Sequence, residues 1–293
     1  MMPKACCKPA RSGIYFAAVG QFSQEESNVG RYYDGPVYEA ELVRLPRDYP
    51  VEFAITRRWL ERLATSGMLV AEIGVGGAHY SQMLAELGCR LHLVDVSQRL
   101  LDSAVRRLRE AGLERQIAGV HHASGARLTN LESVSFDLVL LLGPLYHLRS
   151  SEDRRRCVHE SHRILKPNAT LLAAGINRLS YLRELFRESP MQGSQRRAFH
   201  NQYLGDGNLD PEHAPPIGYA HLTTIPEFRA LFEGLFAEQA LVGAESFTTA
   251  WQKKFNELPP AEAEAWLDLV EQTGSTPEGV AQSDHFLFVG RKR

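Results

Sequence analysis

The chain has 293 residues, 44% hydrophobic and 23% charged, a composition that predicts one large globular domain with appendages. Its 33 basic and 35 acidic residues are well mixed and leave a net charge of −2, so we expect no nucleic-acid partner. The longest apolar run, residues 138–142, is far short of the roughly 20 residues that span a bilayer, and we expect a cytoplasmic protein without a membrane partner. The cysteines show no paired metal-ligand spacing, which predicts neither a metal site nor a disulfide framework: Cys6, Cys7, Cys89 and Cys157.

The first part of the chain predicts an arm followed by the start of a core. Residues 1–50 carry several aromatic side chains, but these do not recur at the regular spacing of a helix or a strand, which favours an arm or lid. A helix is expected over residues 51–65. The pattern then alternates, with an apolar strand at residues 68–73 and a helix at residues 78–87 that Gly88 closes in the left-handed cap position.

The alternation of strand and helix continues through the middle of the chain. Residues 90–95 predict a second strand, and Ser97 is a good N-cap for a helix that Gly112 stops. Residues 119–122 predict a third strand, and the apolar run of residues 136–142 predicts a fourth strand covered on both faces. A helix over residues 151–165 and a fifth strand at residues 170–175 follow. This order predicts an α/β fold with a doubly wound, mostly parallel sheet.

The pattern breaks after Ile176 into a segment rich in Arg, Gln, Asn, Gly and Pro, which we interpret as an inserted substrate cap. Helical periodicity returns over residues 224–236 and again over residues 260–271, and residues 285–290 predict a last strand that closes the sheet edge. The predicted divisions are an arm at 1–50, a core at 51–175, a cap at 176–222 and a C-terminal part of the core at 223–293.

A glycine loop follows the first predicted strand. Such a turn lets a ligand approach the backbone and presents helix N–H groups to an anion or a carboxylate. Loops that bind dinucleotides usually carry a further glycine near the position of Ser81. The serine at this place argues against a loop that binds a pyrophosphate. Asp95 ends the second strand, where a carboxylate can bind both ribose hydroxyls. Glu72, just before the loop, would repel a pyrophosphate but suits a cationic amino-acid ligand.

These segments together resemble the class I methyltransferases that use S-adenosylmethionine (SAM). Residues 70–77 resemble the first motif of that family, residues 93–97 its ribose-binding strand end, residues 136–148 its fourth strand and following loop, and residues 163–169 its turn before strand five. The resemblance implies a seven-stranded Rossmann-like sheet, SAM as cofactor and S-adenosylhomocysteine (SAH) as product. It implies these cofactor-binding residues: Glu72, Gly74, Gly76, Gly77, Asp95, Val96, Ser124, Gly125, Ala126, Leu142, Gly143 and Tyr33.

The sequence departs from the family at two places. After the third strand the family usually carries an acid that holds the adenine amine, whereas residues 124–126 contain none. Adenine would then be held by Ser124, by backbone groups or by apolar neighbours. Asn168 replaces a glycine in the turn before strand five, which is tolerable because asparagine accepts a positive φ.

Methyl transfer from a sulfonium needs mainly alignment and desolvation, and sometimes a base for the acceptor proton. Tyr146 and His147, on the loop after the fourth strand, are the candidate catalytic residues, although a packed aromatic ring and a histidine that fixes the loop are open alternatives. The candidate substrate-binding residues come from the arm and the insertion, where surface or structural roles compete: Tyr32, Arg178, His200, Tyr203 and His221.

The sequence therefore predicts SAM-dependent methyl transfer to an oxygen or nitrogen of a small-molecule metabolite or natural-product precursor. A nicotinamide-dependent oxidoreductase and a non-catalytic SAM-binding protein are the alternatives. The expected partner is the small acceptor, and a homodimer is left open.

Overall fold

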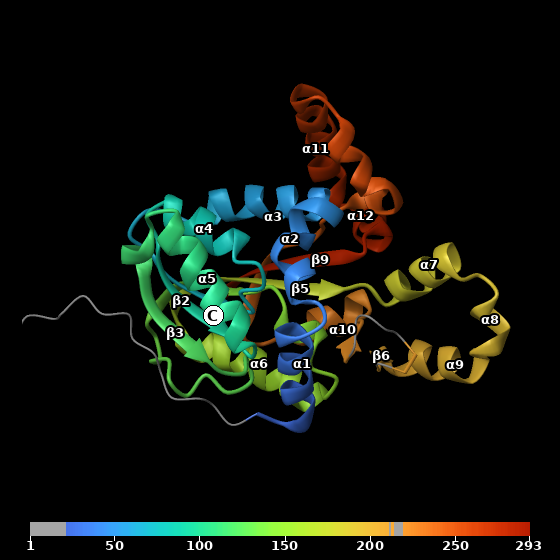
Figure 1. Cartoon of the computed structure of the whole chain (residues 1–293), viewed down its shortest axis with the longest axis horizontal. Coiled ribbons are helices and arrows are strands. Elements are labelled where there is room, and N and C mark those ends of the chain that lie inside the picture. Colours follow the sequence, from blue (N-terminus) through green and yellow to red (C-terminus); the bar gives the residue numbers. More distant parts are fainter. Residues whose placement is uncertain (1–21, 211, 214–218) are drawn as a thin grey trace, which may run out of the picture.

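A computed structural model describes residues 22–210, 212–213 and 219–293; Cys6, Cys7 and the first part of the predicted arm lie outside this range. The central sheet has seven strands in the order β3-β2-β1-β4-β5-β9-β8 (Figure 1). Strands β1 to β5 pair in parallel, while β9 runs antiparallel to both β5 and β8. The predicted doubly wound, mostly parallel sheet is confirmed. Its strands are β1 Leu69–Ile73, β2 Arg90–Asp95, β3 Ile117–His122, β4 Phe136–Leu141, β5 Leu165–Ile176, β8 Phe236–Gly243 and β9 His285–Lys292.

Helices cover both faces of the sheet because successive strand residues point to opposite sides. Leu138 and Leu140 of β4 belong to one buried cluster, and Val139 and Leu141 belong to the other. The helices that pack on the face of Leu138 and Leu140 are α3 Pro50–Leu63, α4 His79–Glu86 and α5 Gln98–Glu110. Those on the opposite face include α6 Ser151–Ile164 and α10 Ile225–Ala230.

The helix ends follow the capping residues seen in the sequence. The Ser97 side chain accepts a hydrogen bond from the backbone N–H of Leu100 at the start of α5. Gly88 and Gly112 have φ values of +87° and +74° where α4 and α5 end, and Asn168 has a φ of +61°. These expectations are confirmed.

The expected helix over residues 224–236 is wrong in its second half. Helix α10 ends at Ala230, and Phe236 already begins β8. Gly234 lies between them with a φ of +76°, a conformation that a continuing helix excludes. Two further helices, α11 Pro260–Gly274 and α12 Pro277–Gln282, precede β9. No helix among the described residues is long and apolar enough to cross a membrane.

The N-terminal arm contributes α1 Gln24–Asp34 and α2 Tyr38–Asp48. Helix α1 lies directly on the loop after β2, since a Cβ atom at Gly30 would stand 2.7 Å from the carbonyl oxygen of Val96. At its end, Asp34 accepts a hydrogen bond of 2.6 Å from the Ser97 hydroxyl. The arm is thereby fixed against the loop that follows the second strand of the core.

The insertion after β5 has its own small core. Figure 1 shows α7, α8 and α9 extending from the end of β5 away from the sheet. Their bounds are α7 Arg178–Glu188, α8 Gln192–Gln195 and α9 Arg197–Asp206, followed by the short strands β6 Asn208–Leu209 and β7 Ala220–His221. Buried residues from these elements pack together: Tyr181, Phe199, Tyr203, Leu209, Ala220 and Leu222.

Candidate functional site

A cavity of about 1140 Å³, counted with its open mouth, lies between the carboxyl ends of the strands and the N-terminal arm. In an open parallel sheet this edge is where ligands bind. Most of the cofactor-binding residues expected from the sequence line it: Glu72, Gly74, Gly76, Gly77, Asp95, Val96, Ser124, Gly125, Leu142, Gly143 and Tyr33. Ala126 is buried and lies outside the lining.

The glycine loop begins where β1 ends. Gly74 has a φ of +87° and Gly76 a φ of +48°, so the chain turns sharply there. A Cβ atom at Gly74 would stand 2.9 Å from Cδ of Pro144 and 3.4 Å from Cα of Gly143. The loop after β1 therefore packs directly on the loop after β4, and both face the cavity.

Glu72 is buried at the base of the glycine loop. Its carboxyl accepts a hydrogen bond from the Ser81 hydroxyl on α4. Burial raises the pKa of Glu72 to about 8, against the opposing effect of the Ser81 hydrogen bond. A cation bound beside this carboxyl would favour its charged form, which fits the expected cationic amino-acid ligand.

Asp95 is a buried carboxylate at the end of β2, beside the glycine loop. One oxygen accepts the backbone N–H of Ser97 at 2.8 Å, and the glycine-loop N–H groups of Gly76 and Val75 also hydrogen-bond to the carboxylate. Burial raises the pKa of Asp95 to about 6, although these hydrogen bonds lower it. Backbone donors thus fix the carboxylate at the end of β2.

The loop after β4 holds both candidate catalytic residues. Pro144–Tyr146 form a short 3-10 helix, and the Tyr146 hydroxyl donates a hydrogen bond of 2.7 Å to the carbonyl of Leu142. His147 Nδ1 lies 3.0 Å from the carbonyl of Tyr219, and because a carbonyl only accepts, Nδ1 carries the proton. His147 Nε2 then accepts from the Tyr33 hydroxyl at 2.9 Å.

His147 consequently joins three parts of the chain: the loop after β4, the arm through Tyr33, and the insertion through Tyr219. Burial lowers the pKa of His147, so the imidazole is neutral at pH 7. Both ring nitrogens are already hydrogen-bonded, which favours the loop-fixing alternative for His147 over the role of a base.

A carboxylate from the arm occupies the position where the sequence showed no acid. Glu26 of α1 is 3% exposed, lines the cavity, and accepts hydrogen bonds from the Ser124 hydroxyl and the Arg127 guanidinium. Burial opposes ionisation of Glu26, but hydrogen bonds from Ser124, the Ser23 N–H and Arg127 outweigh it and lower its pKa. Sequence reasoning missed Glu26, and its visible signal was the capping-box spacing from Ser23.

The remaining wall is polar and aromatic. Glu41 and Arg44 of α2 form an ion pair of 2.8 Å, and Glu52 and Thr56 of α3 lie beside Tyr80 and Tyr146 in the lining. Burial raises the pKa of Tyr146, and the nearby Glu52 carboxylate raises it further. None of these helix residues had a sequence pattern that distinguished it from a solvent-facing residue.

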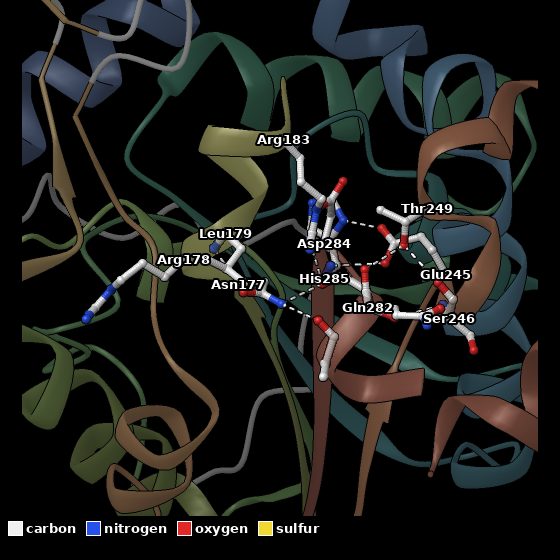
Figure 2. Close-up of polar contacts among 12 residues, drawn as sticks. Asn177, Arg178, Leu179, Arg183, Glu245, Ser246, Thr249, Gln282, Asp284 and His285 are labelled. Atoms are coloured by element: carbon white, nitrogen blue, oxygen red, sulfur yellow. Dashed lines mark hydrogen bonds and ion pairs between the residues drawn. The ribbon is translucent and has the colours of Figure 1, made fainter. Parts of the chain in front are cut away.

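Two of the candidate substrate residues have structural partners in the insertion and in the neighbouring helix α10. Arg178 is buried, forms an ion pair with Glu227 and donates to the carbonyl of Leu222 at 3.2 Å. The Tyr203 hydroxyl donates to the carbonyl of Arg178. Figure 2 shows the Arg178 side chain pointing away from the polar cluster around His285.

The other three candidate substrate residues also lie outside the cavity lining. His221 Nδ1 is 3.0 Å from Oδ1 of Asn208, and burial lowers its pKa to about 3. His200 is half-buried and lies beside the Tyr181 ring. Tyr32 stacks edge-on against Tyr33, so that Tyr33 alone of this pair faces the cavity.

Comparison with known proteins agrees with this architecture. The family model described as a methyltransferase domain matches residues 71–173. The crystal structure of magnesium protoporphyrin IX methyltransferase from Synechocystis PCC 6803 with bound SAH has the same fold, with a TM-score of 0.57, 12% identity, and coverage of 92% of this chain and 100% of that chain. Residues 71–173 therefore match a methyltransferase domain, and the seven-stranded sheet that contains them has the fold of this methyltransferase structure.

Curated relatives share the central part of the chain. Ubiquinone biosynthesis O-methyltransferase of Aromatoleum aromaticum is 29% identical over 121 residues, which are 41% of this chain and 49% of that relative. The protein of the same name from Methylococcus capsulatus is 23% identical over 218 residues, 70% of this chain and 87% of that relative. The chain thus spans about half the length of the first of these relatives.

Proposed function

We propose that this protein transfers a methyl group from SAM to a hydroxyl or amine of a small molecule. The observation that carries the proposal is a single cavity that joins the glycine loop, Asp95 and the loop after β4 beneath the N-terminal arm. When bound, SAM supplies an electrophilic methyl group on a sulfonium. The chain's own residues align the acceptor and exclude water.

The donor groups in the wall suit SAM along its length. Asp95 offers a buried carboxylate to the ribose hydroxyls, and Glu72 offers one to the cationic amino-acid end. A pyrophosphate would have to lie near both carboxylates, which Coulomb repulsion disfavours. This arrangement favours SAM over a nicotinamide dinucleotide.

The arm supplies the acid for the adenine end. Glu26 Oε1 accepts one hydrogen bond, from Ser124, and a carboxylate oxygen has room for a second donor such as the adenine amine. Ala at this position would leave the Ser124 hydroxyl without its acceptor. We therefore assign to Glu26 the role that an acid after β3 plays elsewhere in the family.

A hydroxylated aromatic compound is the acceptor class that the cavity suits best. Tyr33, Tyr80, Tyr146 and Leu287 give it flat apolar walls, and Glu52 places a carboxylate among them. The curated relatives are named as O-methyltransferases, which supports oxygen as the attacking atom.

Incubation of the purified chain with methyl-labelled SAM and separate panels of catechols, simple phenols and amines tests this function. We expect label in extracted catechols or phenols. Label in no member of any panel, from protein that binds SAH, would contradict methyl transfer to these classes and favour the non-catalytic alternative. Stabilisation against heat by NAD and not by SAH would contradict the cofactor assignment.

A further inference from the structure

Three ionisable side chains from distant parts of the chain meet behind the acceptor end of the cavity. Glu52 comes from α3, Glu245 follows β8, and His285 begins β9. Their side chains are 15%, 0% and 12% exposed. Of the three, Glu52 lines the cavity, and the other two lie behind it.

His285 and Glu245 are joined by two hydrogen bonds. His285 Nδ1 donates to one oxygen of Glu245, and the backbone N–H of His285 donates to the other oxygen at 3.0 Å (Figure 2). The Tyr49 ring packs edge-on against the imidazole, with ring centres 5.6 Å apart. Since each Glu245 oxygen already has a donor from His285, Glu245 serves as an anchor for the imidazole.

Glu52 is held less tightly. Its Oε2 lies 3.4 Å from His285 Nδ1, and no hydrogen bond from the described residues reaches its carboxylate. Burial lowers the pKa of His285, but Glu52 and Glu245 outweigh this effect and raise it to about 9, so the imidazole is cationic at pH 7. Burial also raises the pKa of Glu52, although His285 opposes the rise.

The ligand atoms of these three residues lie within 4.8 Å of one another, a spacing that a metal ion could also use. A metal would have to displace the proton that His285 Nδ1 donates to Glu245. A purely structural ion pair would need only His285 and Glu245. The ion pair alone does not account for a second carboxylate at the cavity wall, Glu52, with lone pairs free to accept a proton.

We propose that Glu52 is the general base that removes the proton from the acceptor hydroxyl, with His285 and Glu245 as positioning residues. This inference rests on the proposed methyl transfer. As the acceptor oxygen attacks, its O–H bond breaks and the proton passes to the Glu52 carboxylate. The new O–CH₃ bond forms while the S–CH₃ bond breaks, and the sulfonium becomes the neutral thioether of SAH. The proton leaves Glu52 for solvent after the product departs.

The neighbours of Glu52 suit this step. Tyr80 and Tyr146 are close enough for its charge to raise the pKa of each hydroxyl, in addition to the larger effect of burial. The acceptor ring would therefore lie among tyrosines with its hydroxyl toward a carboxylate. The imidazolium behind Glu52 offsets part of the charge that develops when the acceptor ionises.

4-Nitrocatechol is the probe for this test, because its absorption spectrum changes when its hydroxyl ionises. We would titrate it into SAH-saturated protein at pH 7, a little at a time, and record the spectrum of the bound form. The variants are Glu52→Gln and His285→Gln, with Glu61→Gln as the matched control. Glu61 lies on the same helix as Glu52, with 48% of its side chain exposed and paired with Arg57.

We expect bound nitrocatechol to be ionised in the wild type and in Glu61→Gln. In Glu52→Gln it should bind in the neutral form, and methyl transfer to catechol should fall by about 10²–10⁴-fold. His285→Gln should give a smaller ionised fraction, since the stabilising cation is gone. SAH affinity, measured by calorimetry, should be unchanged within about twofold in Glu52→Gln, which shows that the fold is intact.

Identical bound spectra in the wild type and Glu52→Gln would overturn the assignment of Glu52 while leaving the proposed function intact. Failure of nitrocatechol to bind the SAH-saturated wild type would instead contradict the proposed acceptor class. If activity fell equally in Glu52→Gln and Glu61→Gln, the loss would be structural and the proposal would fail.

Discussion

Gly74, the first residue of the glycine loop, differs from Gly67 in what surrounds it, although both have a positive φ. Gly67 has the same φ of +87°, but a Cβ atom there would have no neighbour within 4 Å. Alanine at either position incurs backbone strain of about 1–2 kcal/mol. At Gly74 the new Cβ would also stand 2.9 Å from Pro144 Cδ, and forced overpacking costs about 1–3 kcal/mol more.

Urea unfolding of the wild type, Gly67→Ala and Gly74→Ala measures this difference. We expect the free energy of unfolding to fall by about 1–2 kcal/mol for Gly67→Ala and by about 2–5 kcal/mol for Gly74→Ala. SAH binding should weaken in Gly74→Ala alone, because the loops after β1 and β4 must separate. Equal losses of stability in the two variants would refute the close packing of Gly74 on Pro144.

Three further predictions concern the arm and the buried cluster. Glu26→Ala removes the acceptor oxygen, and it should weaken SAH binding about tenfold and abolish the preference for SAH over S-inosylhomocysteine, which lacks the adenine amine. Calorimetry that still shows the preference would contradict adenine recognition by Glu26. Tyr33→Phe should speed SAH dissociation about fivefold in stopped-flow measurements, because the hydrogen bond to His147 holds the arm; an unchanged rate would show that the arm does not retain the cofactor. The raised pKa of His285, about 9 against an ordinary 6.5, should add up to about 3 kcal/mol of stability that is complete below pH 6.5 and disappears as the pH rises through 9. Urea unfolding across this range should show the loss in the wild type, and a loss of the same size in His285→Gln would exclude His285 as its source.

The order of strands and the cofactor loop could be predicted because their signals are local. An apolar run such as residues 136–142 identifies a buried strand by itself, and a glycine turn with Asp95 at the next strand end identifies a binding edge. Ser97 and Gly112 could be predicted as the residues that begin and end a helix for the same reason, because capping depends on residues nearby in the sequence. Each of these features depends on neighbours within one βα unit.

Glu26 and the cluster of Glu52, Glu245 and His285 could not be predicted, because long-range packing brings these residues to the site. Glu52, Glu245 and His285 meet through the packing of α3 on the sheet and the antiparallel pairing of β8 with β9. Glu26 reaches Ser124 only when α1 lies across the strand ends. In the sequence each of these glutamates is one charged residue among many, and a charged residue is usually expected to face solvent.

Calorimetric titration of SAH and of NAD into the wild type, Asp95→Asn and Asp102→Asn tests the cofactor site most directly. Asp102 is an exposed residue on α5 that hydrogen-bonds Gln98 and serves as the matched control. We predict that SAH binds the wild type and Asp102→Asn equally, that Asp95→Asn weakens it about 10–100-fold, and that NAD does not bind. Tighter binding of NAD than of SAH, or equal SAH affinity in Asp95→Asn and the wild type, would contradict a SAM site between the glycine loop and Asp95.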